Sequence, residues 1–271
     1  MNTINRIAGA VKEGRLLSGL QRRLDPLREC KLRAALRQWQ VPNRQLPLIH
    51  FHGDFSASPE GVALKGSFDK AQLGTYRLPE EIRSIEGMSG QKYRCLVNNL
   101  VRAYPDPRYL EIGSWAGSTA TAALHGNSVQ ALCIDNWSQF GGPRSEFFSN
   151  MDKVISEDVH FRFLEQDFRR VDYRSIGHFN IYLFDGPHEE ADQCQGVTIA
   201  QPALLDPFIL IVDDWNWRAV RIGTFRGLID AKCRVESSIE LRTTRNNTHP
   251  VVSGQASEWH NGYFLAVVRK G

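Results

Sequence analysis

Acidic residues follow two of the most apolar segments of this 271-residue chain. Asp185 comes directly after Ile181–Phe184, and Asp213 and Asp214 come directly after Phe208–Val212. Because parallel strands end at the same edge of a sheet, we expect the three carboxylates to converge there. Bare carboxylates at close range repel one another, and a hard cation such as Mg²⁺ would relieve this repulsion. Helix capping is the alternative, but it explains single acids better than three together.

A second pattern precedes them, in the sequence Tyr-Leu-Glu-Ile-Gly-Ser-Trp-Ala-Gly-Ser-Thr at residues 109–119. It predicts a buried strand that ends near Glu111, a glycine turn with Gly113 and Gly117, and the start of a helix. Glycines let the backbone approach a ligand closely, and a helix start offers free N–H groups. Asp135 ends the next apolar segment, where a doubly wound sheet places a carboxylate on ribose hydroxyls. A nucleotide-like ligand is therefore indicated, although a tight turn without a ligand can have the same sequence.

The spacing of the glycines distinguishes two kinds of ligand. Dinucleotide sites use Gly-x-Gly-x-x-Gly, and here Trp115 occupies the position of the second glycine. An acid before the turn also suits a cationic ligand better than a pyrophosphate. The segment resembles the first motif of class I S-adenosylmethionine-dependent methyltransferases.

Alternating periodicities indicate the elements that must position these residues. A helix is expected over 91–103, and further helices near 117–124, 144–156, 188–204 and 217–231. Strands are expected at 108–112, 129–135, 161–166, 179–185, 208–213, 234–242 and 263–269. The prediction is an α/β fold with a doubly wound, mostly parallel seven-stranded sheet that ends in an antiparallel C-terminal strand pair.

The charge distribution separates the N-terminal region from the rest. Residues 1–50 hold ten Lys or Arg and three Asp or Glu, and residues 5–40 have helical spacing of apolar side chains. We expect residues 1–80 to be a basic helical extension and connector, and 81–271 to be the catalytic domain. The extension would pack on the body or on a second copy of a homo-oligomer, or contact an anionic membrane surface. Nucleic acid is not the expected partner, because no aromatic residue precedes Trp39.

The amino-acid composition indicates the cellular compartment in which we expect the protein. No apolar run approaches the length of a membrane-spanning helix, and the N-terminus lacks the apolar core of a signal peptide. The five cysteines follow no metal-binding spacing. A cytoplasmic protein with reduced thiols is expected.

The acids and the glycine turn, taken together, point to one protein family. The resemblance covers residues 85–271. The chain resembles the metal-dependent O-methyltransferases of the macrocin (sugar) type, and is distantly similar to catechol O-methyltransferase. The residues that support this are Glu111 to Thr119, Asp135, the Asp-Gly-Pro-His segment at 185–188, and Val-Asp-Asp-Trp at 212–215. The family usually has Asp or Ser where this chain has Pro187.

The resemblance implies roles for individual residues. Asp185, Asp213 and Asp214 would hold Mg²⁺, and His188, or Asp185 itself, would take the proton from a small-molecule or sugar hydroxyl. The cofactor S-adenosylmethionine would be bound by Glu111, Gly113, Ser114, Gly117, Asp135, Asp167 and Ser89. Trp259, His260 and Asn261 would line the acceptor pocket or merely close a hairpin.

Two other functions remain open at this point. One is a nicotinamide-dependent oxidoreductase on the same architecture, which Trp115 disfavours. The other is a non-catalytic scaffold of methyltransferase fold, which the acid group disfavours, since buried unpaired charges are costly without a role.

Overall fold

The computed structural model describes residues 47–75 and 77–271, and its centre is one eight-stranded sheet. The strand order is β1-β7-β8-β6-β5-β2-β3-β4. The strands are β1 (Leu48–Gly53), β2 (Arg108–Ile112), β3 (Val129–Asp135), β4 (Val159–Glu165), β5 (Phe179–Phe184), β6 (Leu204–Val212), β7 (Arg234–Arg242) and β8 (Tyr263–Arg269). Strands β2 to β6 are parallel, and β8 runs antiparallel to both of its neighbours, β6 and β7. The predicted α/β class with a mostly parallel sheet is therefore confirmed.

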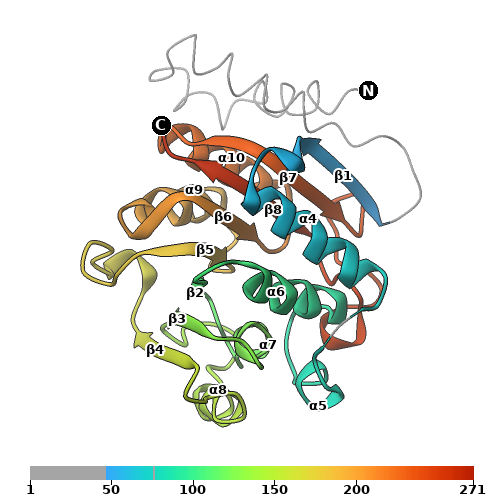
Figure 1. Ribbon diagram of the computed structural model, residues 1–271, viewed down its shortest axis with the longest axis vertical. Coiled ribbons are helices and arrows are strands. Elements are labelled where there is room, and N and C mark those ends of the chain that lie inside the picture. Colours follow the sequence, from blue (N-terminus) through green and yellow to red (C-terminus); the bar gives the residue numbers. More distant parts are fainter. Residues whose placement is uncertain (1–46, 76) are drawn as a thin grey trace. The chain divides into compact units, whose positions relative to one another are not determined.

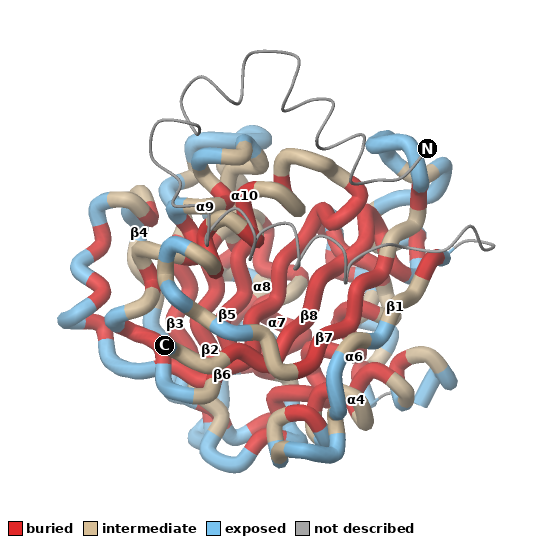
Figure 2. The backbone as a smooth tube through the Cα atoms, turned by 90° about the horizontal axis from the view of Figure 1, so that it is seen from above, coloured by how far each residue is buried: buried red, intermediate tan, exposed pale blue. Residues whose placement is uncertain are grey.

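Helices cover both faces of this sheet. On one face lie α9 (Glu190–Ile199) and α10 (Arg218–Asp230), and on the other lie α4 (Pro59–Gln72), α6 (Gln91–Ala103) and α7 (Ser118–Leu124) (Figure 1). Of two further helices, α8 (Arg144–Met151) lies within the range predicted near 144–156, whereas α5 (Glu80–Arg83) is not among the predicted helices. Because helices cover both faces, the central strands are buried on both sides, as in β5, where all six residues are buried (Figure 2).

The number of strands differs from the predicted seven. β1 adds an eighth strand, because Leu48 to Gly53 pair antiparallel with Arg242 to Ser237 of β7. Pairing at this edge satisfies backbone groups of β7 that would otherwise be open. The sequence gives little sign of β1, because its polar residues resemble those of a connector.

The described residues belong to one compact unit. Residues 48–72, which the sequence assigns to the N-terminal region, contribute β1 and α4 to this unit. Phe68 of α4 is buried and stacks on Trp259, with 5.5 Å between the ring centroids. The predicted basic helix over residues 5–40 lies outside the described residues. Within them, no helix is both long and apolar enough to cross a membrane.

Phe68 offers a test of this attachment. Replacing Phe68 by Ala should lower the free energy of unfolding by about 3–5 kcal/mol, because a buried ring is lost and a cavity remains. Val62 of the same helix is 58% exposed and serves as the control. Val62→Ala should change stability by no more than about 0.5 kcal/mol. Urea titration measures both, and equal effects would show that α4 does not pack on the body as described.

Candidate functional site

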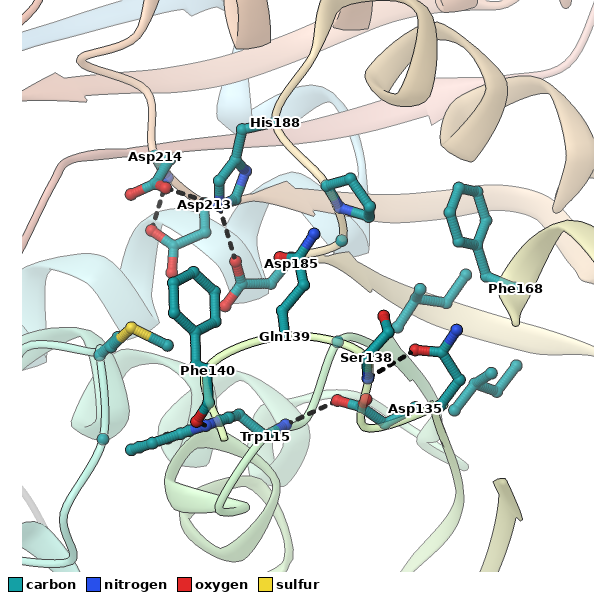
Figure 3. Close-up of a pocket in the computed structure, with 18 of the residues that line it drawn as sticks. Trp115, Asp135, Ser138, Gln139, Phe140, Phe168, Asp185, His188, Asp213 and Asp214 are labelled. Carbon is teal, nitrogen blue, oxygen red and sulfur yellow. Dashed lines mark hydrogen bonds and ion pairs between the residues drawn. The ribbon is translucent and has the colours of Figure 1, made fainter. Parts of the chain in front are cut away.

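The carboxyl ends of the parallel strands surround a cavity of about 550 Å³. Residues after β2, β3 and β4 line one end of it, and residues after β5 and β6 line the other. Figure 3 shows Asp135 and Trp115 at the first end and His188, Asp185, Asp213 and Asp214 at the second. The predicted convergence of strand-end acids at one edge is therefore observed.

The glycines after β2 are required by packing inside the protein. Gly113 has a φ of +86°, and a Cβ there would lie 1.9 Å from the backbone oxygen of Asp185. Gly117 has a φ of +80°, and its Cβ would lie 2.9 Å from the ring of Phe147. Gly113 thus lets the end of β2 meet the end of β5, which brings the glycine turn and the acids into one site.

Glu111 lies beneath this turn and is 1% exposed. Its carboxyl group accepts a hydrogen bond from the hydroxyl of Tyr109. Burial raises the pKa of Glu111 to about 7, although hydrogen bonds from Tyr109 and Ser114 act in the opposite direction. Ser114, Gly117 and Glu111 are not among the residues that line the cavity, so their predicted cofactor contacts remain predictions.

Asp135 joins two loops at the first end of the cavity. Its Oδ2 accepts the backbone N–H of Trp115 at 2.9 Å, and its Oδ1 accepts the backbone N–H of Trp137 at 2.8 Å. The indole Nε1 of Trp115 in turn donates to the backbone oxygen of Phe140 at 3.0 Å. Each carboxylate oxygen keeps a second lone pair, so Asp135 can still accept a hydroxyl from a ligand in the cavity.

The other predicted cofactor residues lie in different surroundings. Asp167 lines the cavity, and its Oδ1 accepts the backbone N–H of Arg169 at 2.9 Å, which caps the short helix η2 (Phe168–Arg170). Ser89 is buried, and its hydroxyl accepts from Nε of Arg94 at 2.9 Å. Ser89 does not line the cavity, whereas its neighbour Met88 does. Their roles toward a cofactor stay predictions.

The acids at the opposite end differ in charge. Burial raises the pKa of Asp185 well above its ordinary range, and the charges of Asp213, Asp214 and Glu111 raise it further. Burial and the charge of Asp214 likewise raise the pKa of Asp213. Both side chains therefore favour the protonated form more than an exposed carboxyl group does.

Asp214 keeps its charge although it is only 8% exposed. Burial alone would raise its pKa, but the hydrogen bond and charge of His188 and the hydrogen bond from Asn261 outweigh burial and lower the pKa. Oδ2 of Asp214 lies 2.8 Å from Nε2 of His188, and Oδ1 accepts from Nδ2 of Asn261 at 2.7 Å. The residue has a φ of +57°, in the left-handed region.

Two histidines face this carboxylate and are not equivalent. His260 accepts the backbone N–H of Gly254 at its Nδ1, at 2.8 Å, so its proton is on Nε2, which lies 3.9 Å from Oδ1 of Asp214. His188 points Nε2 at Asp214, and its buried Nδ1 has no hydrogen-bond partner among the described residues. Of the two histidines, His188 thus has a ring nitrogen without a hydrogen bond to the described residues, and this nitrogen is enclosed rather than open to the cavity.

The predicted magnesium site is not shown by the structure. Within residues 47–75 and 77–271, no group of three or more His, Cys, Asp or Glu side chains is arranged to hold a metal ion. Asp214 contacts His188 and Asn261, and Oδ1 of Asp185 lies 3.9 Å from Nε2 of His188. Carboxyl groups are ligands that a hard cation prefers, so the magnesium site stays a prediction.

The sequence predictions missed part of the cavity lining. Trp217 and His249 line it beside Asp214, with their rings edge to face at 4.8 Å between centroids. His249 belongs to the polar segment between β7 and β8, which carries no motif. Of the three residues expected near the last strand, His260 lines the cavity, Asn261 contacts Asp214, and Trp259 is part of the core.

Comparisons with known proteins concern the fold. Neither a protein-family model nor a curated protein matches the chain. Similar solved structures include TrmN from Thermus thermophilus, with 14% identity over 70% of this chain and 52% of that chain and a TM-score of 0.47. Others are cofactor-bound Rv0187 from MTB (16%, 79% and 91%, 0.48) and an O-methyltransferase from Bacillus cereus in complex with SAH (14%, 76% and 90%, 0.46). This chain spans about half the length of TrmN, and none of these likenesses carries an argument about activity.

Glu111 provides a test of the electrostatics beside the cavity. With a folded pKa of about 7 and an ordinary value of 4.5, Glu111 keeps its proton in the folded state while the unfolded chain loses it. The stability that this proton supports is therefore lost as pH rises from about 4.5 to about 7, by roughly 3 kcal/mol. Glu111→Gln should not show this loss, so its stability relative to wild type should improve from about pH 5 to about pH 8.

The control for this comparison is Glu81→Gln, which removes an acid from an exposed position. Chemical denaturation at several pH values gives the free energies. A constant difference between Glu111→Gln and wild type over this range would contradict the buried, protonated state of Glu111.

Proposed function

We propose that this protein is a class I methyltransferase that transfers the methyl group of S-adenosylmethionine to a hydroxyl group of a small molecule or sugar. The observation that supports this most is the single cavity that joins two kinds of side chain. One end presents Asp135 after β3, the position of a ribose-binding acid in doubly wound sheets. The other end presents His188 and Asp214, which can remove a proton from an acceptor.

The charge of the site favours a sulfonium cofactor over a nicotinamide dinucleotide. The backbone N–H of Trp115, at the position of the second glycine in dinucleotide sites, donates to Asp135. It is therefore directed toward a carboxylate and away from a pyrophosphate. The charged Asp214 at the far end also suits a cation better than phosphate groups.

The methyl transfer itself requires few groups from the protein. The acceptor oxygen, the methyl carbon and the sulfur must lie in line, which a cavity that holds both substrates achieves by orientation. His188, the histidine in contact with Asp214, takes the proton of the hydroxyl as the oxygen attacks. Asp214 stabilises the resulting charge on the imidazole through its 2.8 Å contact with Nε2.

Magnesium is a separate part of the proposal. Asp185, Asp213 and Asp214 would together hold Mg²⁺ once they are deprotonated. When bound, the ion would lower the pKa of the acceptor hydroxyl. The raised pKa values of Asp185 and Asp213 support it, because a site that favours a proton also gains from another cation.

Other sequence expectations are carried forward as proposals. These are a homo-oligomer, contact of the basic N-terminus with a membrane surface, and a cytoplasmic location. A non-catalytic scaffold is disfavoured by the contact of His188 with a charged carboxylate.

Cofactor binding tests the first part of the proposal. Isothermal calorimetry should show binding of S-adenosylhomocysteine and no binding of NAD. Asp135→Ala should weaken S-adenosylhomocysteine by about 10–100-fold, because hydrogen bonds to a charged group are worth roughly 1.5–3 kcal/mol. Asp158→Ala, at an exposed position, is the control. Binding of NAD alone would instead support the oxidoreductase.

Turnover tests the base and the metal separately. Using an acceptor found by screening phenols and glycosides with S-adenosylmethionine, His188→Ala should lower kcat by roughly 10²–10⁴, the usual range for loss of a general base. EDTA and Asp213→Asn should both lower turnover while the affinity for S-adenosylhomocysteine is kept. If EDTA has no effect and His188→Ala is still impaired, the magnesium part is wrong and the base stands. Full activity of His188→Ala would refute the base.

A further inference from the structure

Asp214 can contact His188 productively only if its carboxylate has a fixed orientation. A free carboxylate can turn about its bond to Cβ and present either oxygen to the imidazole. In this structure one oxygen, Oδ1, is already occupied by Asn261 at 2.7 Å, which leaves Oδ2 for His188. The orientation of the Asn261 amide therefore decides how Asp214 meets the histidine.

The amide of Asn261 is oriented by a second asparagine, Asn216, which is fully buried. Nδ2 of Asn216 donates to Oδ1 of Asn261 at 3.0 Å and to Oγ1 of Thr243 at 2.8 Å. Because the oxygen of Asn261 faces Asn216, its nitrogen must face Asp214. If the Asn261 amide were reversed, two oxygens would meet at Asp214.

The orientation of Asn216 is in turn fixed by the backbone. Its Oδ1 accepts the N–H groups of Thr243 at 2.9 Å and Thr244 at 3.1 Å, and a backbone N–H can only donate. All four hydrogen-bonding positions of the Asn216 amide are thus used, so the amide cannot reverse without loss. The main chain of Asn216 is held as well, by Asn261 and by Nη1 of Arg221.

These contacts form a directed series across three parts of the chain. It runs from the backbone after β7 to Asn216 after β6, then to Asn261 before β8, and then to Asp214 and His188. The geometry assigns Asn216 and Asn261 as positioning residues that hold Asp214 so that Nε2 of His188 carries the proton of the neutral imidazole. This assignment rests on the proposed function in one respect only, namely that the reaction is methyl transfer to a hydroxyl group.

A positioning role gives a reason for the two buried asparagine amides at this place in the protein. Buried amides must satisfy all their hydrogen bonds to avoid a loss of stability, and an apolar core would need none. Neither asparagine lines the cavity, so neither is placed to contact a substrate. The hydrogen bonds lead from main-chain N–H groups to one carboxylate, and every member is satisfied. Their effect is to fix the orientation of that carboxylate.

The tautomer of His188 is measurable without substrate or cofactor. Proton–nitrogen correlation spectra of ¹⁵N-histidine-labelled full-length protein separate the two tautomers, and His188→Gln identifies the His188 signals. Wild type should show the Nε2–H form of His188. A His188 with its proton on Nδ1 would overturn the assignment.

Two substitutions interrupt the series at different points. Asn261→Leu removes the donor to Asp214 with little change in size. Asn216→Asp keeps the acceptor for Thr243 and Thr244 but replaces the donor by an oxygen, which should reverse the Asn261 amide. Both should convert the His188 signals to a mixture of tautomers or to exchange between them. If one variant does not fold, the other still decides the outcome.

Asn98→Leu is the matched control. Asn98 is also a buried asparagine whose Nδ2 makes two hydrogen bonds, to the backbone oxygens of Ala122 and His125, far from the cavity in the fold. It should lose stability and leave the His188 spectrum unchanged. A His188 spectrum that is unchanged in Asn261→Leu and Asn216→Asp as well would show that the two asparagines serve folding only.

Turnover separates this inference from the proposed function. With an acceptor from the screen, Asn261→Leu should lower kcat by about 10–100-fold, the range for partners that orient a functional group, with little change in KM for S-adenosylmethionine. If methyl transfer occurs but the variants match Asn98→Leu, the positioning role is refuted and the function stands. If wild type transfers no methyl group but the tautomer changes as described, the function is refuted and the positioning role stands.

Discussion

Repulsion between buried carboxylates is the constraint on which the site depends. Asp185, Asp213 and Asp214 are placed together because their strands end at one edge of the sheet. The protein avoids three adjacent charges by giving the acids different partners. Asp214 stays charged through His188 and Asn261, whereas the pKa values of Asp185 and Asp213 are raised, which favours their protonated forms. One acid thus supports a base, and the other two form a place for positive charge.

A second close contact joins this acid group to the rest of the cavity. The backbone oxygen of Asp185 occupies the space that a side chain at Gly113 would fill, so β2 and β5 can end against each other. Across the same turn, Asp135 holds the N–H groups of Trp115 and Trp137. These two N–H groups are therefore directed at a carboxylate, which is why a cationic cofactor suits the cavity better than a dinucleotide.

Much of this arrangement could be predicted from the sequence, and the remainder could not for identifiable reasons. Apolar runs ended by Asp185 and Asp213 indicate both the strands and the shared edge. The glycine pattern indicates the turn, but the sequence gives no sign that Gly113 is required by Asp185. β1 is missed because an edge strand with polar side chains resembles a connector. Asn216 and Asn261 are 45 positions apart, and only the pairing of β6, β7 and β8 brings them together.

Hydrogen exchange with and without S-adenosylhomocysteine tests most directly whether the cavity between these strand ends is the cofactor site. The amides of 111–117 and 134–142 should exchange more slowly with the ligand, because a cofactor on Asp135 would hold the two loops that this residue joins. Amides of β1, at the far edge of the sheet, should not change. Protection by NAD in these segments, or no protection there when S-adenosylhomocysteine binds, would contradict the account.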